Sequence, residues 1–205
     1  MSACGADQAP RIDSPQSFEP QPIRIQLNAG VPAESFGVLE RPEGPLRFGV
    51  GHGRFGIACA GTRFQEGVTP LGRFRVNAVL SEDRFAMDPA LVQRSGKSEA
   101  ELRASLFRNM NSIDFKGDGQ TGEYGIGYIS LEPVPASDQP FQFNTYDGTF
   151  RWYSFAIHGS NDDARVGQAV TGGCINVGQL TMEILLDRVQ LGDTVEISSD
   201  SPCLP

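Results

Sequence analysis

Histidine and cysteine are scarce in this chain, and a long apolar run is missing. Among 205 residues there are two histidines, four cysteines and one tryptophan. No run of apolar residues approaches the roughly 20 that a membrane-spanning helix needs. The sequence therefore predicts no transmembrane helix, and any chemistry that needs histidine depends on one of two positions.

Positive charge is also in short supply. The chain carries 17 lysines and arginines against 25 aspartates and glutamates, which gives a formal net charge of −8 at pH 7. Nucleic-acid binding needs a basic face that neutralises phosphates, so nucleic acid is not expected as a main partner. The length and a hydrophobic fraction of 39% fit one main globular domain with a short additional segment.

The first 22 residues have the composition of a flexible tether, rich in proline, glutamine and serine. They contain no charged segment followed by an apolar run, so they include no intact signal peptide. Met1 to Cys4, followed by Gly5, resembles the end of a bacterial lipoprotein signal. In that interpretation Cys4 carries a lipid that anchors the protein to a membrane. An ordinary start of the coding sequence is the alternative.

The four cysteines are Cys4, Cys59, Cys174 and Cys203. If Cys174 is a reactive thiol and Cys4 a lipid attachment site, Cys59 and Cys203 remain as a possible pair. A disulfide between them would attach the C-terminal tail to an early strand and would indicate an oxidising compartment. Two unrelated thiols are the alternative, because the sequence does not show that they meet.

Short runs rich in valine, isoleucine, phenylalanine and tyrosine predict a mostly β, largely antiparallel fold. Glycine, proline and aspartate separate these runs. The segment 46–59 predicts a hairpin that turns at Gly51, His52 and Gly53. The predicted strands are 22–27, 46–51, 54–59, 72–80, 125–132, 151–158 and 193–198.

Two segments predict short helices. The first covers 98–110, where Ser98 and Glu101 have the spacing of a capping box. The second covers about 178–188 and begins a few residues after Cys174. Its predicted core-facing stripe consists of Leu180, Ile184, Leu185 and Val189.

One histidine and one cysteine, His158 and Cys174, lie 16 residues apart among glycines. A nearby imidazole favours the thiolate, which is the nucleophilic form of a cysteine. Gly172 and Gly173 permit a tight turn whose backbone N–H groups could stabilise an oxyanion. By spacing alone a purely structural role stays open, and two such ligands are too few for a zinc site.

Three ordered motifs resemble those of L,D-transpeptidases of the YkuD type. They are Ile157-His158-Gly159 followed by Thr171-Gly172-Gly173-Cys174-Ile175-Asn176, the upstream segment 68–76 (VTPLGRFRV), and the downstream segment 185–197 (LLDRVQLGDTVEI). The resemblance implies a mostly β, sandwich- or barrel-like fold with one or two short helices. It divides the chain into a tether (1–22), an N-terminal extension packing on the domain (23–45), a catalytic domain (46–198) and a C-terminal tail (199–205).

The resemblance also implies roles for individual residues. Cys174 would be the nucleophile, His158 its base, and Gly159 the residue whose carbonyl orients the imidazole. The oxyanion hole would consist of the N–H groups of Gly173 and Cys174, with Gly172 as a further contributor. Thr171 and Asn176 would shape the turn or bind substrate. Tyr153, beside Trp152 in the predicted strand that ends at His158, is a further substrate-binding candidate, with core packing as the alternative.

The implied reaction starts from a tetrapeptide stem of peptidoglycan and belongs to cell-wall biogenesis. The thiolate would form a thioester with release of the terminal D-amino acid, and an amine acceptor would then resolve it. No metal or organic cofactor is implied, carbapenem-type β-lactams are the expected inhibitors, and the periplasm or cell envelope is the expected compartment.

Two departures from the family pattern leave alternatives open. The family's second histidine is Gly172 here, and the gap of twelve residues between His158 and Thr171 is slightly short. Hydrolysis at the same site, as in an L,D-carboxypeptidase, an endopeptidase or an antibacterial effector, is therefore one alternative. A catalytically inactive cell-envelope-binding module with the same fold is the other.

Overall fold

The structure, a computed structural model, describes residues 22–59, 66–109, 124–134, 145–146, 149–150 and 155–204. Its strands are β1 (Ile23–Leu27), β2 (Phe36–Leu39), β3 (Leu46–Gly49), β4 (His52–Gly53), β5 (Ile57–Ala58), β6 (Thr69–Pro70), β7 (Gly72–Ser81), β8 (Phe85–Met87), β9 (Gly127–Pro133), β10 (Thr145–Tyr146), β11 (Thr149–Phe150), β12 (Ala156–His158), β13 (Ala169–Thr171), β14 (Ile175–Asn176) and β15 (Thr194–Ser199). The α-helices are α1 (Pro89–Ser95), α2 (Glu99–Asn109) and α3 (Gln179–Arg188), and the 3₁₀ turns are η1 (Pro32–Glu34) and η2 (Asp163–Arg165).

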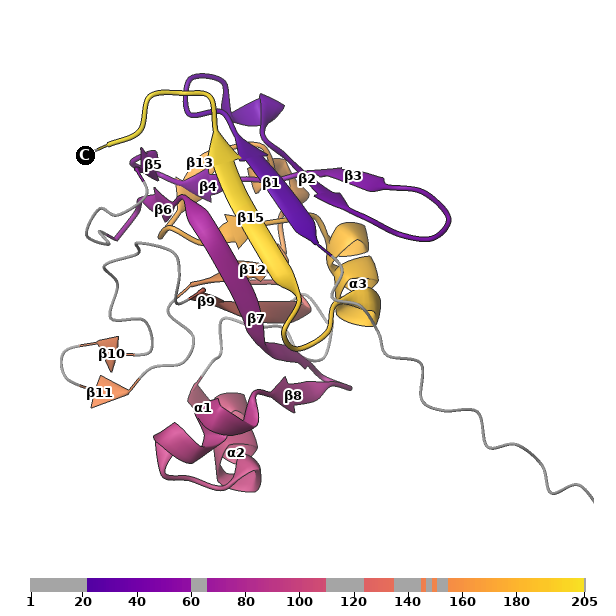
Figure 1. Cartoon of the computed structure of the whole chain (residues 1–205), viewed down its shortest axis with the longest axis vertical. Coiled ribbons are helices and arrows are strands. Elements are labelled where there is room, and N and C mark those ends of the chain that lie inside the picture. The colour runs from indigo at the N-terminus through magenta and orange to yellow at the C-terminus, as the bar shows by residue number, and fades with distance from the viewer. Residues whose placement is uncertain are drawn as a thin grey trace, which may run out of the picture.

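A nine-stranded sheet forms the body of the protein and confirms the predicted mostly β fold. Its strand order is β14-β12-β9-β7-β15-β1-β2-β3, with β8 added alongside β7. The pairs β1–β15 and β12–β14 are parallel and the other pairs are antiparallel. Figure 1 shows β7, β15 and β1 side by side. The predicted N-terminal extension thus contributes β1 and β2 to the main sheet.

Strand β7 lies near the middle of this sheet and changes character along its length. At its start the strand alternates: Phe74 and Val76 are fully buried, whereas Arg73, which precedes Phe74, is exposed. The register with β9 shifts between Val76 and Ala78, so Asn77 is an inserted, buried residue. Beyond this bulge both faces of β7 are covered.

The core consists of two clusters, and Cys174 packs against both. The larger cluster lies along the main sheet and includes Phe74, Ile157 and Leu185. The smaller cluster includes Tyr128 and extends under α1 and α2, which lie together beyond the end of β7 (Figure 1). The candidate nucleophile is therefore at the boundary between the two hydrophobic clusters.

The helices confirm part of the prediction and correct part of it. The capping box forms, because Ser98 N–H donates to Glu101 Oε2 at 2.8 Å and Glu101 N–H donates to Ser98 Oγ at 3.3 Å. Helix α3 is present, but the predicted stripe is wrong at Leu180, which is 75% exposed. Its buried residues are Met182 and Leu185. Leu180 precedes Met182 by two residues, about 200° around the helix, so the two side chains face opposite ways.

Helix α1 was not predicted, although its boundary signals are present in the sequence. Asp88 is the N-cap, with its carboxylate accepting from Ala90 N–H at 2.8 Å. Pro89 follows at the first helical position, and Gly96 ends the helix at φ 67°. With seven residues the helix is too short to display a clear apolar period.

The predicted hairpin over 46–59 is wrong. Strand β3 pairs with β2, and His52 lies on β4, which pairs in parallel with β13. Gly51 and Asn176 exchange two backbone hydrogen bonds, at 3.0 and 3.2 Å. A Cβ on Gly51 would overlap the Asn176 side chain. Gly51 is thus needed for close approach to another strand, and His52 is fully buried instead of exposed in a turn.

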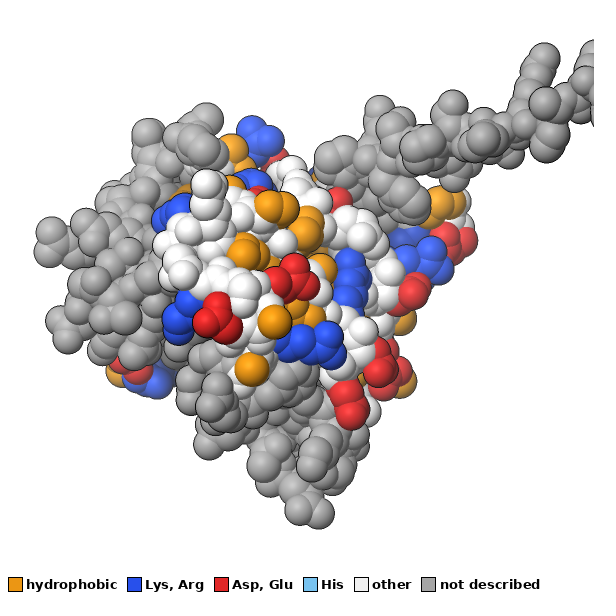
Figure 2. Space-filling view, turned by 90° about the horizontal axis from the view of Figure 1, so that it is seen from below, with side chains coloured by type: hydrophobic (Ala, Val, Ile, Leu, Met, Phe, Trp, Pro, Cys, Tyr) orange, Lys and Arg blue, Asp and Glu red, His pale blue; other side chains and the backbone are white. Residues whose placement is uncertain are grey.

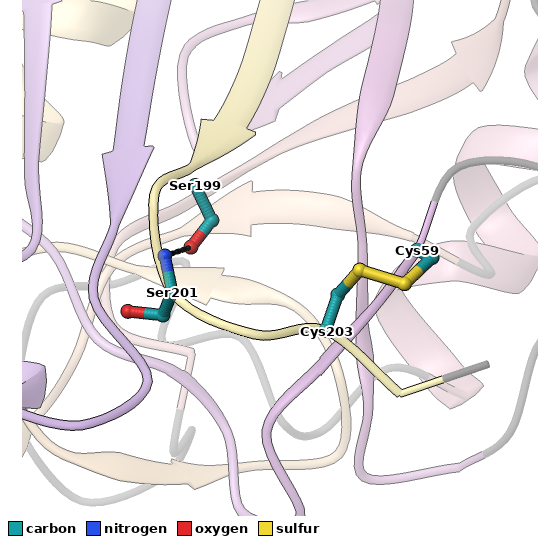
Figure 3. The surroundings of a disulfide bond; sticks show 4 residues. All are labelled: Cys59, Ser199, Ser201 and Cys203. Atoms are coloured by element: carbon teal, nitrogen blue, oxygen red, sulfur yellow. Dashed lines mark hydrogen bonds between the residues drawn. A yellow bond between two sulfur atoms is a disulfide. The ribbon is translucent and has the colours of Figure 1, made fainter.

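The cysteine pair that the sequence left open is formed. Cys59 and Cys203 make a disulfide, with their Cα atoms 5.0 Å apart (Figure 3). Leu204 N–H donates to Ile57 O at 2.8 Å, and Cys59 N–H donates to Leu204 O at 2.9 Å. The C-terminal tail therefore lies against β5, with which it shares both a covalent bond and backbone hydrogen bonds.

The described surface mixes the two signs of charge. Figure 2 shows acidic and basic side chains interspersed over the face seen from below, with hydrophobic side chains in small groups between them. Within the described residues, the helices are all too short or too polar to cross a bilayer.

Candidate active site

His158 is the last residue of β12 and is held on both sides by strand pairing. It lies opposite Tyr128 of β9 and Asn176 of β14, and it is 4% exposed. The parallel register also pairs Ile157 with Ile175. Because Cys174 directly precedes Ile175 and His158 directly follows Ile157, the predicted nucleophile and base belong to neighbouring strands and are offset by two positions along the pair.

The hydrogen bond of the His158 ring defines its tautomer. Nδ1 lies 2.6 Å from Gly159 O. A carbonyl oxygen only accepts, so Nδ1 carries the proton and Nε2 keeps a lone pair. This contact agrees with the orienting carbonyl that the sequence assigned to Gly159.

Burial lowers the pKa of His158 to about 4. The hydrogen bond to Gly159 acts in the opposite direction, and the positive charge of Arg165 lowers the pKa further. The imidazole is therefore neutral at pH 7. It is available there as a base through Nε2.

Gly159 is fixed in a position where a larger residue would not fit. Its N–H donates to Gly127 O at 3.1 Å, while His158 O accepts from Val177 N–H at 2.9 Å. A Cβ on Gly159 would lie 3.0 Å from Tyr124 O and 3.3 Å from Met182 Cγ. The glycine thus lets the chain beside the imidazole pack tightly against the 124–126 turn.

Two tyrosines near His158 were missed by the sequence reasoning. The Tyr124 ring centroid lies 4.3 Å from that of His158, and the Tyr128 ring is parallel to the imidazole at 6.3 Å. Tyr128 and His158 both belong to strands that were predicted, but the pairing of these two strands was not, so the place of Tyr128 beside His158 could not be inferred. The His158 ring is thus buried in an aromatic environment.

The turn that carries Cys174 is anchored through four consecutive carbonyl oxygens. Thr171 O accepts from Arg54 N–H at 3.0 Å, and Gly172 O accepts from Gly67 N–H at 2.7 Å. Gly173 O accepts from the Thr69 hydroxyl at 2.8 Å. Cys174 O accepts from the Thr171 hydroxyl at 2.6 Å. Three of the four donors lie in the 54–69 region, more than 100 residues earlier in the chain.

The N–H groups predicted for the oxyanion hole are not equivalent. Gly173 N–H donates to Thr171 Oγ1 at 3.1 Å, so it is engaged within the turn. Gly173 also has φ 127°, a conformation that favours glycine. Gly172 is exposed, and a Cβ there would meet nothing within 4 Å. Of these predicted donors, Gly173 N–H is therefore already engaged within the turn.

The other predicted site residues lie mostly inside the fold. Thr171 is 5% exposed and Asn176 is 2% exposed. Asn176 Nδ2 donates to Arg165 O at 3.3 Å. Of the two roles considered for these residues, shaping the backbone fits the geometry better than binding substrate. Tyr153 lies outside the described residues.

Cys174 is partly buried and is not part of a disulfide. Nowhere in the described part of the chain do three or more His, Cys, Asp or Glu side chains meet in a way that could hold a metal ion. The candidate site combines a partly buried thiol, a buried imidazole at the end of the neighbouring strand, and a turn that is held through its carbonyl oxygens.

One protein-family model matches most of the chain. The model of the L,D-transpeptidase catalytic domain, YkuD, matches residues 33–197. No curated protein sequence shows significant similarity.

Several solved structures are similar at low identity. An L,D-transpeptidase from Mycobacterium smegmatis is 14% identical with TM-score 0.40, covering 86% of this chain and 58% of that one. L,D-transpeptidase 3 from Mycobacterium tuberculosis, in complex with a faropenem-derived adduct, is 12% identical with TM-score 0.42, covering 87% and 60%. The L,D-transpeptidase from Xylanimonas cellulosilytica is 13% identical with TM-score 0.40, covering 91% and 64%. The chain thus spans less than two thirds of each.

Proposed function

Because the chain belongs to the L,D-transpeptidase catalytic domain family, we propose that it catalyses cysteine-dependent acyl transfer on tetrapeptide stems of peptidoglycan. The observation that carries this proposal is the state of His158. The imidazole is neutral, has its Nδ1–H committed to Gly159 O, and ends the strand beside the one that follows Cys174. A neutral imidazole in one fixed tautomer, on the strand next to the one that follows the thiol, supports the role of His158 as the base.

In the first half-reaction Nε2 of His158 takes the proton of the Cys174 thiol. The thiolate attacks the carbonyl carbon between the third stem residue and the terminal D-amino acid, and the carbonyl oxygen becomes an oxyanion facing Cys174 N–H. When this intermediate collapses, the C–N bond breaks and the imidazolium gives its proton to the leaving amine. The D-amino acid leaves and a Cys174 thioester remains.

In the second half-reaction an amine of another stem attacks the thioester. His158 takes a proton from this amine, the C–S bond breaks, and the thiolate is protonated again by the imidazolium. The product contains a new amide bond, and the enzyme returns to its starting state. The protonated imidazole exists only beside a thiolate or an oxyanion, so the buried positive charge is always accompanied by a negative one.

Hydrolysis at the same site is a second candidate, favoured by the open space at Gly172. The exposed backbone there has room for a side chain that this protein lacks. Water that enters this space would compete with an amine for the thioester. The products distinguish the outcomes, since transfer gives a crosslink or an exchanged residue and hydrolysis gives a tripeptide stem.

The disulfide supports a location in the cell envelope. Structural disulfides persist in oxidising compartments such as the periplasm and are rare in the cytosol. The peptidoglycan substrate that the family implies is found in the same place. Attachment through a lipid on Cys4 remains part of the proposal, and Cys4 lies outside the described residues.

The experiment that tests the proposal is intact-mass spectrometry after incubation with a carbapenem. The wild type is expected to gain the mass of one carbapenem, because the thiolate opens the β-lactam ring and the resulting thioester is retained. Cys174→Ala is expected to gain none, with circular dichroism showing that it remains folded. A wild type that stays unmodified would contradict the proposal and favour a binding module. Product analysis on purified muropeptides would then separate transfer from hydrolysis.

A further inference from the structure

Thr69 contacts the nucleophile turn from a strand to which the sequence assigned no chemistry. It begins β6 and is 0% exposed. Its hydroxyl accepts a hydrogen bond from Gly53 N–H at 2.8 Å and donates one to Gly173 O at 2.8 Å. Both contacts span long separations in the chain, so the hydroxyl links β4 and β6 to the turn directly before Cys174.

The direction of the Thr69 hydroxyl proton is fixed by its two partners. A threonine hydroxyl has one proton and two lone pairs. Gly53 N–H can only donate, so it occupies a lone pair, and the single proton goes to Gly173 O. The χ1 angle of threonine is restricted by its branched Cβ, and the residue is fully buried. The hydroxyl therefore holds Gly173 O in one place.

The position of Gly173 O determines the direction of the next N–H group. A trans peptide unit is planar, with its C=O and N–H pointing in opposite directions. Gly173 O and Cys174 N–H belong to the same peptide unit. Because Gly173 O points at Thr69, Cys174 N–H points away from Thr69.

We propose that Thr69 is a positioning residue that aims Cys174 N–H at the oxyanion formed during acylation of Cys174. The inference rests on the proposed function, because it assumes that Cys174 attacks a carbonyl. It adds a residue outside the Cys/His motif to the machinery. Thr69 does not touch the reacting atoms and acts through the Gly173–Cys174 peptide unit.

The hydrogen bond from Thr69 to Gly173 O can be removed by a side-chain substitution, unlike the bonds to the two preceding carbonyls. The carbonyls of Thr171 and Gly172 are held by backbone N–H groups of Arg54 and Gly67. A side-chain substitution does not delete those donors. Among the described residues, the hydroxyl of Thr69 is the side-chain donor that reaches the turn from another strand.

The test compares two reactions of the same thiol in Thr69→Val and in Thr69→Ser. Acylation by a carbapenem passes through an oxyanion, and alkylation by iodoacetamide does not, because the thiolate displaces iodide from a saturated carbon. Thr69→Val keeps the size of the side chain and removes the hydroxyl. Thr69→Ser keeps the hydroxyl and serves as the matched control.

Thr69→Val is expected to slow acylation by about tenfold to a hundredfold, somewhat less than deleting an oxyanion donor outright. Its alkylation rate and the pH dependence of that rate are expected to match the wild type. Thr69→Ser is expected to acylate within about threefold of the wild-type rate. If Thr69→Val does not fold, Thr69→Ala removes the same hydroxyl without placing a methyl group against Gly173 O and carries the comparison.

Three results would overturn the inference. Unchanged acylation in a folded variant that lacks the hydroxyl would show that Cys174 N–H does not depend on Thr69. Equal losses in acylation and alkylation would show a general structural role. A wild type that is alkylated but never acylated would overturn the proposed function, and this inference with it, which sets that failure apart from the other two.

Discussion

His158 ends β12 and Cys174 directly precedes the neighbouring β14, but these two halves of the candidate site are held by different kinds of contact. His158 is placed by regular pairing with β9 and β14, and its ring is buried beside aromatic side chains. The Cys174 turn has little regular pairing of its own. It is held through its carbonyl oxygens by donors at Arg54, Gly67 and Thr69.

This difference shows which half of the chemistry each part of the chain controls. The sheet and the core set the pKa of the His158 imidazole, because burial lowers it to about 4. The remote 54–69 region sets the orientation of the turn, because its donors fix successive peptide planes. Substitutions that disturb the His158 half should therefore have measurable effects that differ from those of substitutions that disturb the Cys174 turn.

The largest effect is expected for His158→Gln, which tests activation of the thiol separately from orientation of the turn. His158→Gln keeps an amide that can donate to Gly159 O but has no basic nitrogen. Acylation is expected to fall by about 10²- to 10⁴-fold, as for loss of a general base. Unlike in Thr69→Val, alkylation of Cys174 at neutral pH is expected to fall as well, because both reactions need the thiolate. The two rates are measured by intact-mass spectrometry.

His52→Gln is the matched control for this change. His52 is the other histidine, is equally buried, and lies on β4. We expect its alkylation and acylation rates to stay within a few-fold of the wild-type values. An unaffected alkylation rate in His158→Gln would contradict the assignment of His158 as the base that activates Cys174.

The next largest effect concerns stability at acidic pH, which depends on the lowered pKa of the buried His158. Its pKa is lowered from 6.5 to about 4, so between these pH values the unfolded chain binds a proton that the folded protein does not. Its contribution to stability is thus complete above pH 6.5 and is lost as the pH falls toward 4. The loss in unfolding free energy reaches about 3 kcal/mol, at about 1.4 kcal/mol per pKa unit.

Urea unfolding at pH 7 and at pH 4.5 measures this loss. The wild type should lose more stability on acidification than His158→Gln, which has no imidazole to protonate. Equal losses in the two proteins would mean that other groups account for the acid sensitivity, and that His158 is more accessible to water than its 4% exposure indicates.

The smallest effect compares one glycine from each half of the site. Gly159→Ala places a Cβ 3.0 Å from Tyr124 O, so we expect a loss of about 1–3 kcal/mol in unfolding free energy. Gly172→Ala places a Cβ in open space, so we expect a change within about 0.5 kcal/mol. Thermal unfolding of the two variants measures both values. A larger loss for Gly172→Ala would mean that the turn is tighter than its contacts show.

The sequence predicted the parts of the site that depend on local pattern. The strands of 72–80 and 193–198 were indicated by their composition and appear as β7 and β15. The capping box at Ser98 was visible in its spacing and is formed. The order of the family motifs selected Cys174 and His158 as candidates, and in the fold Cys174 directly precedes β14 while His158 ends the neighbouring β12.

The parts that the sequence did not predict depend on long-range pairing. His52 was placed in a hairpin turn because glycines surround it, but Gly51 is needed for contact with Asn176. Thr69 was visible only as part of a motif, because its bond to Gly173 O joins residues 104 positions apart. Leu180 fits an apolar period, but the sheet covers the opposite side of α3.

The parallel pairing of β1 with β15 has a mechanical consequence. A force that pulls β1 at Ile23 and β15 at Ser199 acts at opposite ends of two parallel strands, so it runs along the strands. All the hydrogen bonds between them then share the load in shear, and β2 and β7 support the pair on either side. Beyond β15 the disulfide transfers load from the tail to β5 at Cys59. The main sheet is therefore expected to resist tension along the chain, and the candidate site at β12 and β14 lies outside the line of that force.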